Sequence, residues 1–401
     1  MIPKVRYRIA SFNIKQFSNE SASHGDVEAK KDLNTIAKII TDNSIDIIAI
    51  QEIQGKNAFR ELMAAIACGY SKDITADILE KTCVDGKQQL RSVLGGNDYL
   101  ACSAGDWQGR WTKPNSKWGT AISEEGYAFI WNTRRIGLPI NGRGEVQPVI
   151  KHKKEIKFVR PPFYGRFITR DINVAFEIRL LNVHVLYTKN AKLKKLKDSD
   201  IDVSLLNSSC KEERMNVMRQ MREANLSPLE ISQLQKFNVL DDIARRKYEV
   251  KNLITEVLSR EEDDLGWGRY CIMLGDYNLN LINSCANYKD KRAVIEEIIP
   301  YGKNRNEKKK YIVKQEQLTS LSRPAKREKD PEDLYNKKTG EDRYVNNYDH
   351  FTYNINMTDS GGRDIYIGEP VRINVDKYGL TNREYYERVS DHLPIMMEIG
   401  F

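Results

Sequence analysis

A nearly all-apolar run at Ile45–Gln51 is the feature that most restricts the fold of this chain. The run reads IDIIAIQ, and its lack of polar alternation is typical of a strand that is buried on both faces. It follows a strand-like segment at Arg6–Phe12 and a segment at Val27–Asn43 with apolar residues at helical spacing. Those helical positions are Leu33, Ile36, Ala37 and Ile40. Because a strand buried on both faces needs covering helices, this order predicts an α/β or α+β fold.

Further apolar runs predict additional strands. They lie at Tyr127–Trp131, Ile172–Leu186, Tyr270–Leu274, Asp349–Tyr353, Asp364–Ile367 and Leu393–Ile399. Several of these runs are close together in the sequence, which favours hairpins and mixed sheets. The length of 401 residues by itself allows one enlarged domain or two.

Two polar stretches, residues 189–241 and 283–346, interrupt this rhythm and are rich in lysine. We interpret both as insertions in one domain of residues 1–401, because the strands on either side fit a single sheet system. Lys and Arg total 64 while Asp and Glu total 56, so the net charge is +8. A mild excess of positive charge permits a polyanionic partner without requiring one.

The N-terminal segment contains basic residues and lacks the apolar stretch of a secretory signal. No run approaches the ~18 apolar residues of a membrane span. The sequence therefore predicts a cytoplasmic protein without a transmembrane segment. The six cysteines are scattered without a Cys-x-x-Cys pair, so we expect reduced thiols and no zinc site.

Polar residues stand where the predicted apolar strands end. They are Asn13, Glu52, His184, Asp276 with Asn278, Asp349, and Asp391 with His392. Carboxylate and amide oxygens without thiolates suit a hard cation such as Mg²⁺ or Mn²⁺, which substrate phosphate oxygens can also coordinate. Imidazoles can transfer protons near neutral pH. Together these groups predict metal-assisted hydrolysis of a phosphoester.

Each of these residues also has a purely structural interpretation. A lone Asn after a strand is most often a turn residue, and a His inside an apolar strand is more often a hydrogen-bonded core residue. For His350, which follows Asp349, we favour the structural interpretation. The catalytic hypothesis depends on the combination, since independent turns need not supply every component of one reaction.

The ordered motifs resemble those of the endonuclease/exonuclease/phosphatase superfamily. The resemblance spans the chain through SFN at Ser11–Asn13, QE at Gln51–Glu52, GDYN at Gly275–Asn278 and SDHLP at Ser390–Pro394. The last two motifs are the most specific. The resemblance implies a four-layer α/β sandwich of two mixed sheets, with helices outside and one cleft at an end of the sandwich. Motifs of one site that extend from Asn13 to His392 favour a single domain.

The resemblance also assigns roles to these residues. Asn13 and Glu52 resemble the metal and phosphate end of the family site, while Asp276 and Asn278 resemble the pair that binds metal and positions the water or the phosphate. Asp391 is similar to a metal-side aspartate. His392 resembles a catalytic imidazole that a carboxylate, here Asp349, holds in place.

Two further segments resemble the deoxyribonuclease I branch. Glu125, in SEEGYAF at Ser123–Phe129, would orient His184, which would protonate the leaving oxygen. Arg160, in VRPPF at Val159–Phe163, would contact phosphate, and a solvated strand start is an equally weighted alternative. These roles predict products with 5′-phosphate and 3′-hydroxyl ends.

The metal ligands alone do not distinguish among phosphoester substrates, so the substrate must be inferred from other parts of the sequence. The lysine-rich stretches favour nucleic acid, as does a segment that mixes aromatic rings and cations: Trp107, Arg110, Trp111 and Lys113. We expect DNA rather than RNA, because the arrangement of Glu125 and His184 resembles deoxyribonuclease I. The alternatives are an RNase, a phosphoinositide or phospholipid phosphoesterase, and a scaffold that binds nucleic acid without catalysis. Protein partners are not indicated.

Overall fold

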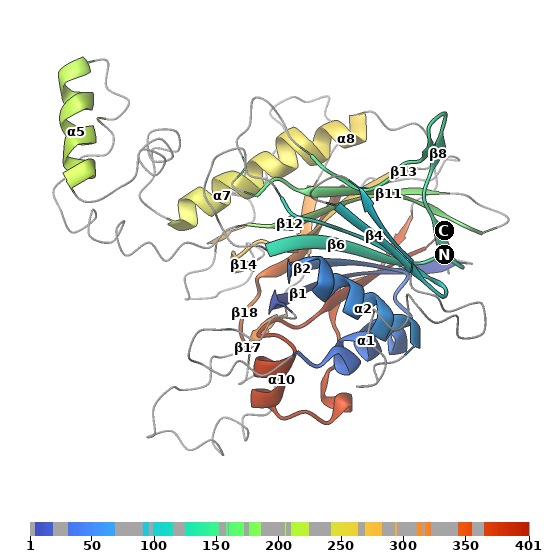
Figure 1. The fold of residues 1–401 in the computed structure, drawn as a ribbon. Helices are drawn as coiled ribbons and strands as arrows, with labels where there is room; N and C mark the ends of the chain where they lie inside the picture. The colour runs from blue at the N-terminus through green and yellow to red at the C-terminus, as the bar shows by residue number, and fades with distance from the viewer. Residues whose placement is uncertain are drawn as a thin grey trace.

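Two mixed β-sheets form the centre of the computed structural model (Figure 1). The described residues are 5–18, 31–68, 91–95, 99–114, 125–151, 158, 160–171, 176–185, 205, 210–223, 242–263, 269–282, 293–294, 311–314, 317–321, 344–354 and 365–400. The order in the first sheet is β20 (Tyr366–Ile367), β22 (Ile395–Gly400), β1 (Arg6–Phe17), β2 (Ile47–Gln54), β6 (Glu125–Asn132), β5 (Trp107–Thr112), β4 (Tyr99–Ala104) and β3 (Arg91–Gly95), and β21 (Val371–Arg372) also pairs with β22.

The second sheet is smaller and also mixed. Its order is β10 (Val149–Ile150), β11 (Phe163–Thr169), β12 (Glu177–His184), β13 (Arg269–Asp276), β19 (Asp349–Asn354) and β16 (Tyr311–Lys314), and β7 (Ile136–Gly137) also pairs with β11. Within the sheets, β1 pairs with β2 and β12 with β13 in parallel, and the neighbouring pairs are antiparallel. Three short pairs lie outside them: β8 (Ile140–Asn141) with β9 (Gly144–Glu145), β14 (Leu281–Ile282) with β15 (Ala293–Val294), and β17 (Ser320–Leu321) with β18 (Tyr344–Asn346).

Helices cover the outer faces of the two sheets. On the first sheet, α1 (Leu33–Asp42) and α2 (Lys56–Cys68) pack against each other and bury their apolar faces in the outer core, and α2 lies mainly against β4 and β5. Asp32 caps the start of α1, because its side chain accepts a hydrogen bond from the Thr35 backbone N–H at 3.1 Å. On the second sheet lies a continuous helical segment formed by α7 (Asp242–Asn252), the π-helical turn η2 (Leu253–Leu258) and α8 (Ser259–Asp263). The four layers are visible in Figure 1, and the predicted α/β sandwich is confirmed.

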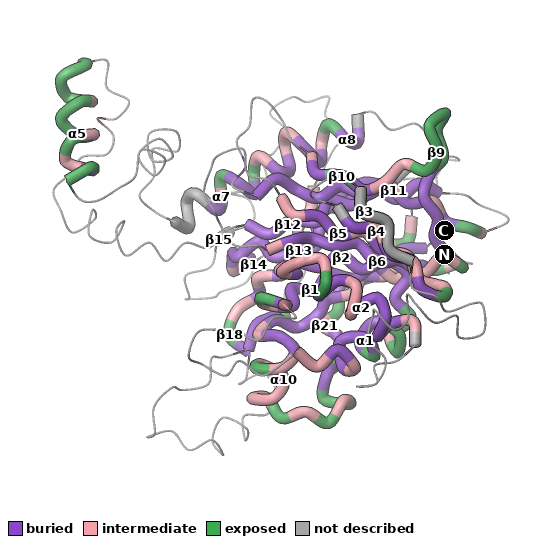
Figure 2. Tube along the Cα trace, in the orientation of Figure 1, coloured by how far each residue is buried: buried purple, intermediate pink, exposed green. Residues whose placement is uncertain are grey.

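Two further helices and a 3₁₀ turn are described, and one of these helices buries Tyr385 in the core of the first sheet. α10 (Asn382–Arg388) begins with a capping box between Thr381 and Glu384, and the 3₁₀ turn η5 (Asp376–Tyr378) precedes it. α5 (Lys211–Glu223) is mostly exposed, as Figure 2 shows, and lies in the first predicted insertion. Among the described helices, none has the length and apolar character that a membrane crossing requires.

Part of the second predicted insertion contributes to the sheet system. β16 lies within residues 283–346, yet it pairs with β19 at the edge of the second sheet. β17 and β18 lie in the same stretch and pair with each other. The lysine-rich parts at residues 189–197 and 303–310 lie outside the described residues. The insertion boundaries and the single domain therefore stay predictions.

The face that each central strand turns toward the other sheet changes from apolar to polar at one end. On β12 the inward series runs from Ile178 and Leu180, which are in the inter-sheet core, to Asn182 and His184. The same alternation ends in Asn13 on β1, Gln51 on β2, Glu125 on β6, Asp276 on β13 and Asp349 on β19. One end of the sandwich interior is therefore lined by polar side chains from both sheets.

Candidate active site

The carboxylate of Asp276 lies at the centre of this polar end. It is almost fully buried, at 1% exposure. Its Oδ2 accepts a hydrogen bond from Asn13 Nδ2 at 2.9 Å. The same oxygen lies 3.7 Å from Nε2 of His184 and 3.7 Å from Nε2 of His392. The site thus contains residues that are far apart in the sequence. The first of them, Asn13, and the last, His392, are 379 positions apart.

The pairing of β12 with β13 places His184 beside Asp276. The two residues are register partners at the ends of these parallel strands. Gly275 precedes Asp276 with a φ of +142°, and a Cβ there would lie 2.0 Å from the carbonyl oxygen of Val183. Only glycine allows this close approach of the two backbones. The GDYN motif therefore begins with a glycine for a steric reason.

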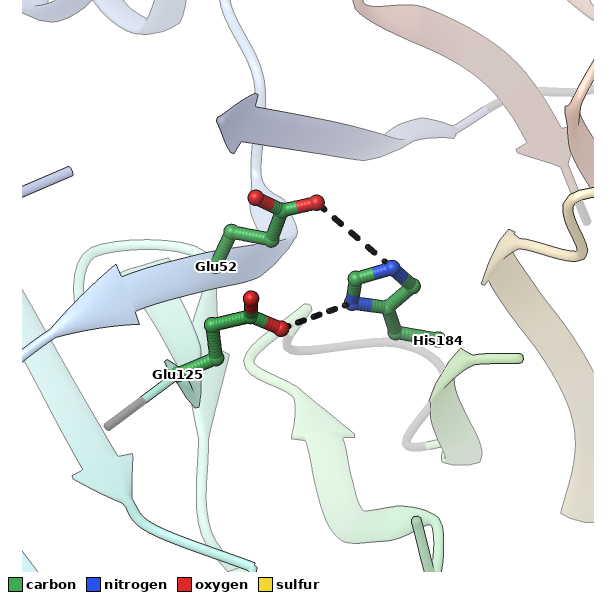
Figure 3. A group of neighbouring side chains, drawn as sticks. All are labelled: Glu52, Glu125 and His184. Carbon is green, nitrogen blue, oxygen red and sulfur yellow. Dashed lines mark ion pairs between the residues drawn. The ribbon is translucent and has the colours of Figure 1, made fainter. Parts of the chain in front are cut away.

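A β-bulge in β2 turns Glu52 toward the site. Its register with β6 shifts between Ile50 and Ile53, and Glu52 has a positive φ of 64°. Bulges re-aim side chains, and a left-handed non-glycine residue at such a point is often functional. Oε1 of Glu52 accepts from Asn13 Nδ2 at 2.9 Å and lies 3.5 Å from Nε2 of His184 (Figure 3). The bulge thus joins the predicted metal end of the site to His184.

His392 and Asp349 form a close buried pair. Nδ1 of His392 is 2.8 Å from Oδ2 of Asp349, so the carboxylate orients the ring and leaves Nε2 facing Asp276. Ser390 supports this segment, because its hydroxyl donates to the Asn13 carbonyl at 2.6 Å and accepts from the His392 backbone N–H at 3.0 Å. The geometry agrees with the orienting role that the resemblance gave to Asp349.

On the other side of the site, Arg160 replaces the expected contact between Glu125 and His184. Oε2 of Glu125 is 3.9 Å from Nδ1 of His184, which is too far for a hydrogen bond (Figure 3). The Arg160 guanidinium instead forms an ion pair with Glu125, and its Nη1 lies 2.7 Å from Nδ1 of His184. The guanidinium thus contacts both groups, and the orienting role of Glu125 stays a prediction.

The electrostatic surroundings of the two imidazoles are opposite. Burial, the Arg160 guanidinium and His392 hold the pKa of His184 well below its usual value. Burial opposes protonation of His392, but the carboxylates of Asp349 and Asp276 outweigh it and hold the His392 pKa well above its usual value. Burial also raises the pKa of Asp276. The two imidazoles therefore differ in their preference for a proton.

Several donors at the site suit a divalent cation. Two groups of ligand atoms each lie within 4.8 Å of one another: Glu52, Glu125 and His184 in one, and Asp276, Asp349 and His392 in the other. Oδ1 of Asp349 is buried and accepts no hydrogen bond from a described residue. The Asn13 amide joins the Glu52 and Asp276 carboxylates from the two sheets. These oxygen donors fit Mg²⁺ or Mn²⁺.

Two other predicted metal ligands, Asp391 and Asn278, make different contacts in the structure. Asp391 forms an ion pair with Lys15 at 3.3 Å and belongs to neither ligand group among the described residues. Asn278 has a positive φ of 50°, and its side-chain amide donates to the Val185 carbonyl at 2.8 Å. Its backbone N–H donates to Oδ1 of Asp276 at 2.7 Å, so Asn278 helps to fix that carboxylate.

The predicted nucleic-acid segment is divided between the core and the surface. Trp111 is only 3% exposed, and its Nε1 donates to the Ile53 carbonyl at 3.1 Å. The prediction that Trp111 contacts nucleic acid is wrong, because the ring packs in the core between the first sheet and its helices. Trp107 pairs with Asn132, at the other end of β6 from Glu125.

The two cations of that segment are partly exposed. Arg110 donates to the Gln147 side chain at 3.3 Å. Lys113 directly follows β5, whose last residue pairs with Tyr127 close to Glu125. Lys113 is therefore the member of the segment that stands at the site end of the sheet.

Sequence reasoning missed a buried polar link beneath the site. Gln51 Nε2 donates to Asn182 Oδ1 at 2.7 Å, and Asn182 Nδ2 donates to the carbonyls of Ile50 and Ala128. Asn182 lies two residues before His184 on the same strand face, which is the signal that could have revealed it. His350 is structural, as expected: it is buried, and its Nε2 contacts the Leu279 carbonyl at 3.0 Å.

Comparisons with known proteins identify similar structures at low sequence identity. The sequence matches no protein-family model and no curated protein. Humanized D. rerio TDP2 is 10% identical with a TM-score of 0.41, and the match covers 99% of both chains. An endonuclease/exonuclease/phosphatase family protein from Bacteroides thetaiotaomicron is 12% identical with a TM-score of 0.41, covering 100% of this chain and 99% of that one. The human nocturnin catalytic domain is 12% identical with a TM-score of 0.40, covering 99% of this chain and 94% of that one.

The architecture agrees with the resemblance seen in the motifs. Two mixed sheets pack face to face between helices, and the motif residues from both sheets meet at one end. The chain thus has the four-layer α/β sandwich that the motif resemblance implies.

Proposed function

We propose that this protein is a cytoplasmic, divalent-metal-dependent phosphodiesterase that acts on nucleic acid, with DNA preferred over RNA. The main observation that supports the proposal is that two imidazoles lie close to the same carboxylate oxygen of Asp276. Nε2 of His184 and Nε2 of His392 are each 3.7 Å from the same carboxylate oxygen. Hydrolysis of a phosphoester needs separate groups for the attacking water and for the leaving oxygen, and this site has a different set on each side.

The His392 side of the site suits activation of water. Asp349 holds Nδ1 of His392 at 2.8 Å, so Nε2 faces the site and would accept a proton from a water molecule once bound metal charge offsets the carboxylates that favour a proton on the ring. Asp349 then stabilises the imidazolium that forms. This arrangement keeps the ring in one orientation during the reaction.

The Arg160 side of the site suits departure of the leaving oxygen. Arg160 is buried, with 9% exposure, and Glu125 pairs with its guanidinium. A fixed cation offsets negative charge that develops on an oxygen in the transition state. We therefore assign charge stabilisation at the leaving 3′ oxygen to Arg160, while neutral His184 supports the guanidinium through its ring nitrogen.

Glu52 and Asp276 would hold a divalent cation at the junction of the two sheets, where the Asn13 amide donates to both carboxylates and its Oδ1 accepts from the Lys15 backbone N–H. When it is bound there, Mg²⁺ or Mn²⁺ supplies positive charge to the phosphate and offsets the carboxylate charge that favours a proton on His392.

Support for nucleic acid comes from charge and from the deoxyribonuclease I-like segments. The net charge is +8, and the lysine-rich stretches interrupt the sequence between motif residues. Lys113 lies at the site end of β5. We propose an endonuclease that leaves 5′-phosphate and 3′-hydroxyl ends.

A substrate panel tests the proposal. The purified protein is incubated with Mg²⁺ and labelled linear DNA, circular DNA, RNA, an abasic duplex, a phosphoinositide and sphingomyelin. Cleavage of circular DNA would demonstrate endonuclease action, and end labelling would give the product termini. Selective turnover of the phosphoinositide or of sphingomyelin would instead reject nucleic acid as the substrate. Binding without any turnover would favour the scaffold.

A further inference from the structure

Thr319 joins the two chain segments that carry Asp349 and His392. Its side chain is fully buried. Its hydroxyl accepts hydrogen bonds from the backbone N–H groups of Tyr348 at 3.0 Å and Asp349 at 3.2 Å. Its carbonyl accepts from the Leu393 backbone N–H at 2.7 Å. One residue therefore holds the backbone beside both members of the pair.

The residues next to Thr319 extend this contact. Ser320 forms a β-bridge with His392. The Leu321 backbone N–H donates to the Asp391 carbonyl at 2.7 Å. Residues Thr319–Leu321, which we call the clip, thus run alongside the SDHLP motif.

Pairing between strands cannot set the distance from Asp349 to His392. Asp349 begins β19 in the second sheet, whereas His392 precedes β22 in the first sheet. Strands in different sheets share no ladder of hydrogen bonds that would fix their relative position. The clip contacts both segments at the point where the two side chains meet.

Removal of the Thr319 hydroxyl would take away the hydrogen-bond acceptor of two backbone N–H groups. A valine has nearly the same shape but offers a methyl group where the two N–H donors now find an acceptor. Without that acceptor, the backbone at Tyr348 and Asp349 would have to move so that its N–H groups could find other partners. A shift at Asp349 would change its distance to the His392 imidazole.

We propose that Thr319 is a positioning residue that sets the hydrogen bond between Asp349 and His392. The catalytic consequence rests on the proposed function, but the geometric claim does not. Thr319 belongs to the second predicted insertion, residues 283–346. The proposal therefore gives part of that insertion the role of supporting the active site.

The test compares three substitutions that change similar volumes. Thr319→Val removes the hydroxyl, and Thr319→Ser retains it. Thr352→Val is the matched control, because Thr352 is equally buried on β19 but bonds Tyr277 at 2.8 Å on the opposite face of the strand. Circular dichroism and urea unfolding establish that each variant folds. Thr319→Ala replaces the valine variant if valine prevents folding.

The first readout needs no catalysis. In protein labelled with ¹⁵N-histidine, the Nδ1–H proton of His392 gives a hydrogen-bonded resonance that His392→Gln identifies by its disappearance. Thr319→Val should shift or remove this resonance, while Thr319→Ser and Thr352→Val should keep it. An unchanged resonance in Thr319→Val would overturn the proposal, whatever the protein hydrolyses.

The second readout is kinetic. Loss of an outer supporting contact typically costs about 10–100-fold in activity, and we expect this loss in kcat for Thr319→Val with little change in KM. In an Asp349→Asn background the same substitution should have almost no effect, because the pair through which it acts is already broken. Equal losses in both backgrounds would contradict the proposal. A wild-type protein without phosphoesterase activity would reject the proposed function, and the resonance would still decide the role of Thr319.

Discussion

Nδ1 of His392 lies 2.8 Å from Oδ2 of Asp349, although the two residues are 43 positions apart and belong to segments of different sheets. Both are buried, at 8% and 0% exposure. A buried carboxylate next to an imidazole fixes the ring and favours its protonated form. The two residues should therefore act as one catalytic unit.

Asp349→Asn and His392→Ala should each lower kcat by about 10²–10⁴-fold, as expected for loss of general acid or base catalysis. The double variant should be about as slow as the slower single variant, because residues that act as a unit are not additive. Steady-state kinetics of the three variants measure this. His350→Gln, which changes a buried imidazole outside the pair, should remain active. If the rate losses of the two single variants multiply in the double variant, Asp349 and His392 do not act as one unit.

Arg160→Ala should slow hydrolysis of a normal phosphodiester by about 10²–10³-fold, because a fixed donor to the leaving oxygen is lost. A substrate with a 3′-bridging sulfur has a better leaving group and needs less charge stabilisation. The loss caused by Arg160→Ala should therefore be much smaller on the sulfur substrate. An equal loss on both substrates would place Arg160 away from the leaving atom.

EDTA should abolish activity, and Mg²⁺ or Mn²⁺ should restore it. Glu52→Gln should raise the Mg²⁺ concentration that gives half-maximal activity, because it removes a carboxylate beside Asp276 and Asn13. Asp391→Asn should raise that concentration less, since Asp391 pairs with Lys15. Metal titrations of activity test this order. Full activity in EDTA would reject the metal dependence.

The free energy of unfolding should depend on pH through Glu177. Burial opposes ionisation, but hydrogen bonds from Arg166 and Arg179 lower the Glu177 pKa below its usual value of 4.5. The folded form therefore gains stability from this carboxylate above about pH 4.5, and the gain disappears as the pH falls through the lower folded pKa. Glu177→Gln should cost roughly 2–4 kcal/mol at pH 7, because Arg179 is buried and would lose its partner.

Glu398 provides the matched control for Glu177. It also pairs with two arginines, Arg6 and Arg8, but all three side chains are partly exposed. Glu398→Gln should cost at most about 1 kcal/mol. Urea unfolding at pH 7 and at pH 3 measures both variants. A Glu177→Gln penalty that is as large at pH 3 as at pH 7 would contradict the electrostatic explanation.

The lysine-rich residues 303–310 should contribute to DNA binding. Replacing Lys308, Lys309 and Lys310 with alanine should weaken binding and reduce the dependence of affinity on salt, by up to ~0.9 in the logarithmic slope per lost phosphate contact. Fluorescence anisotropy at several salt concentrations measures both quantities. Lys251→Ala, at an exposed position on α7, is the control. Unchanged affinity and slope would show that these lysines are only a charged surface.

The layers of the fold could be predicted because they depend on local patterns. The apolar run before Glu52 forms β2, and the helical spacing of Ile36 and Ile40 forms α1, both buried as expected. The end of each strand was also visible, since a polar residue follows the apolar series. The boundaries were less accurate, as β1 extends to Phe17 rather than ending at Phe12.

Features that depend on contacts between distant segments could not be predicted. No local pattern announces the positive φ at Glu52 or the position of Arg160 between Glu125 and His184. Trp111 appeared in a run of aromatic and basic residues, yet the face of β5 that α2 covers is set by tertiary packing. Thr319 lies in a polar stretch, and only the folded chain brings it to His392.

The most direct test is hydrolysis of circular DNA in Mg²⁺ by the wild-type protein and by folded Asp276→Ala and His392→Ala variants. The wild type should nick the DNA and leave 5′-phosphate and 3′-hydroxyl ends, and EDTA should stop the reaction. Each variant should lose at least about 10²-fold in rate, because each removes a group at the centre of the site. Unchanged hydrolysis by both variants would contradict the assignment of this site.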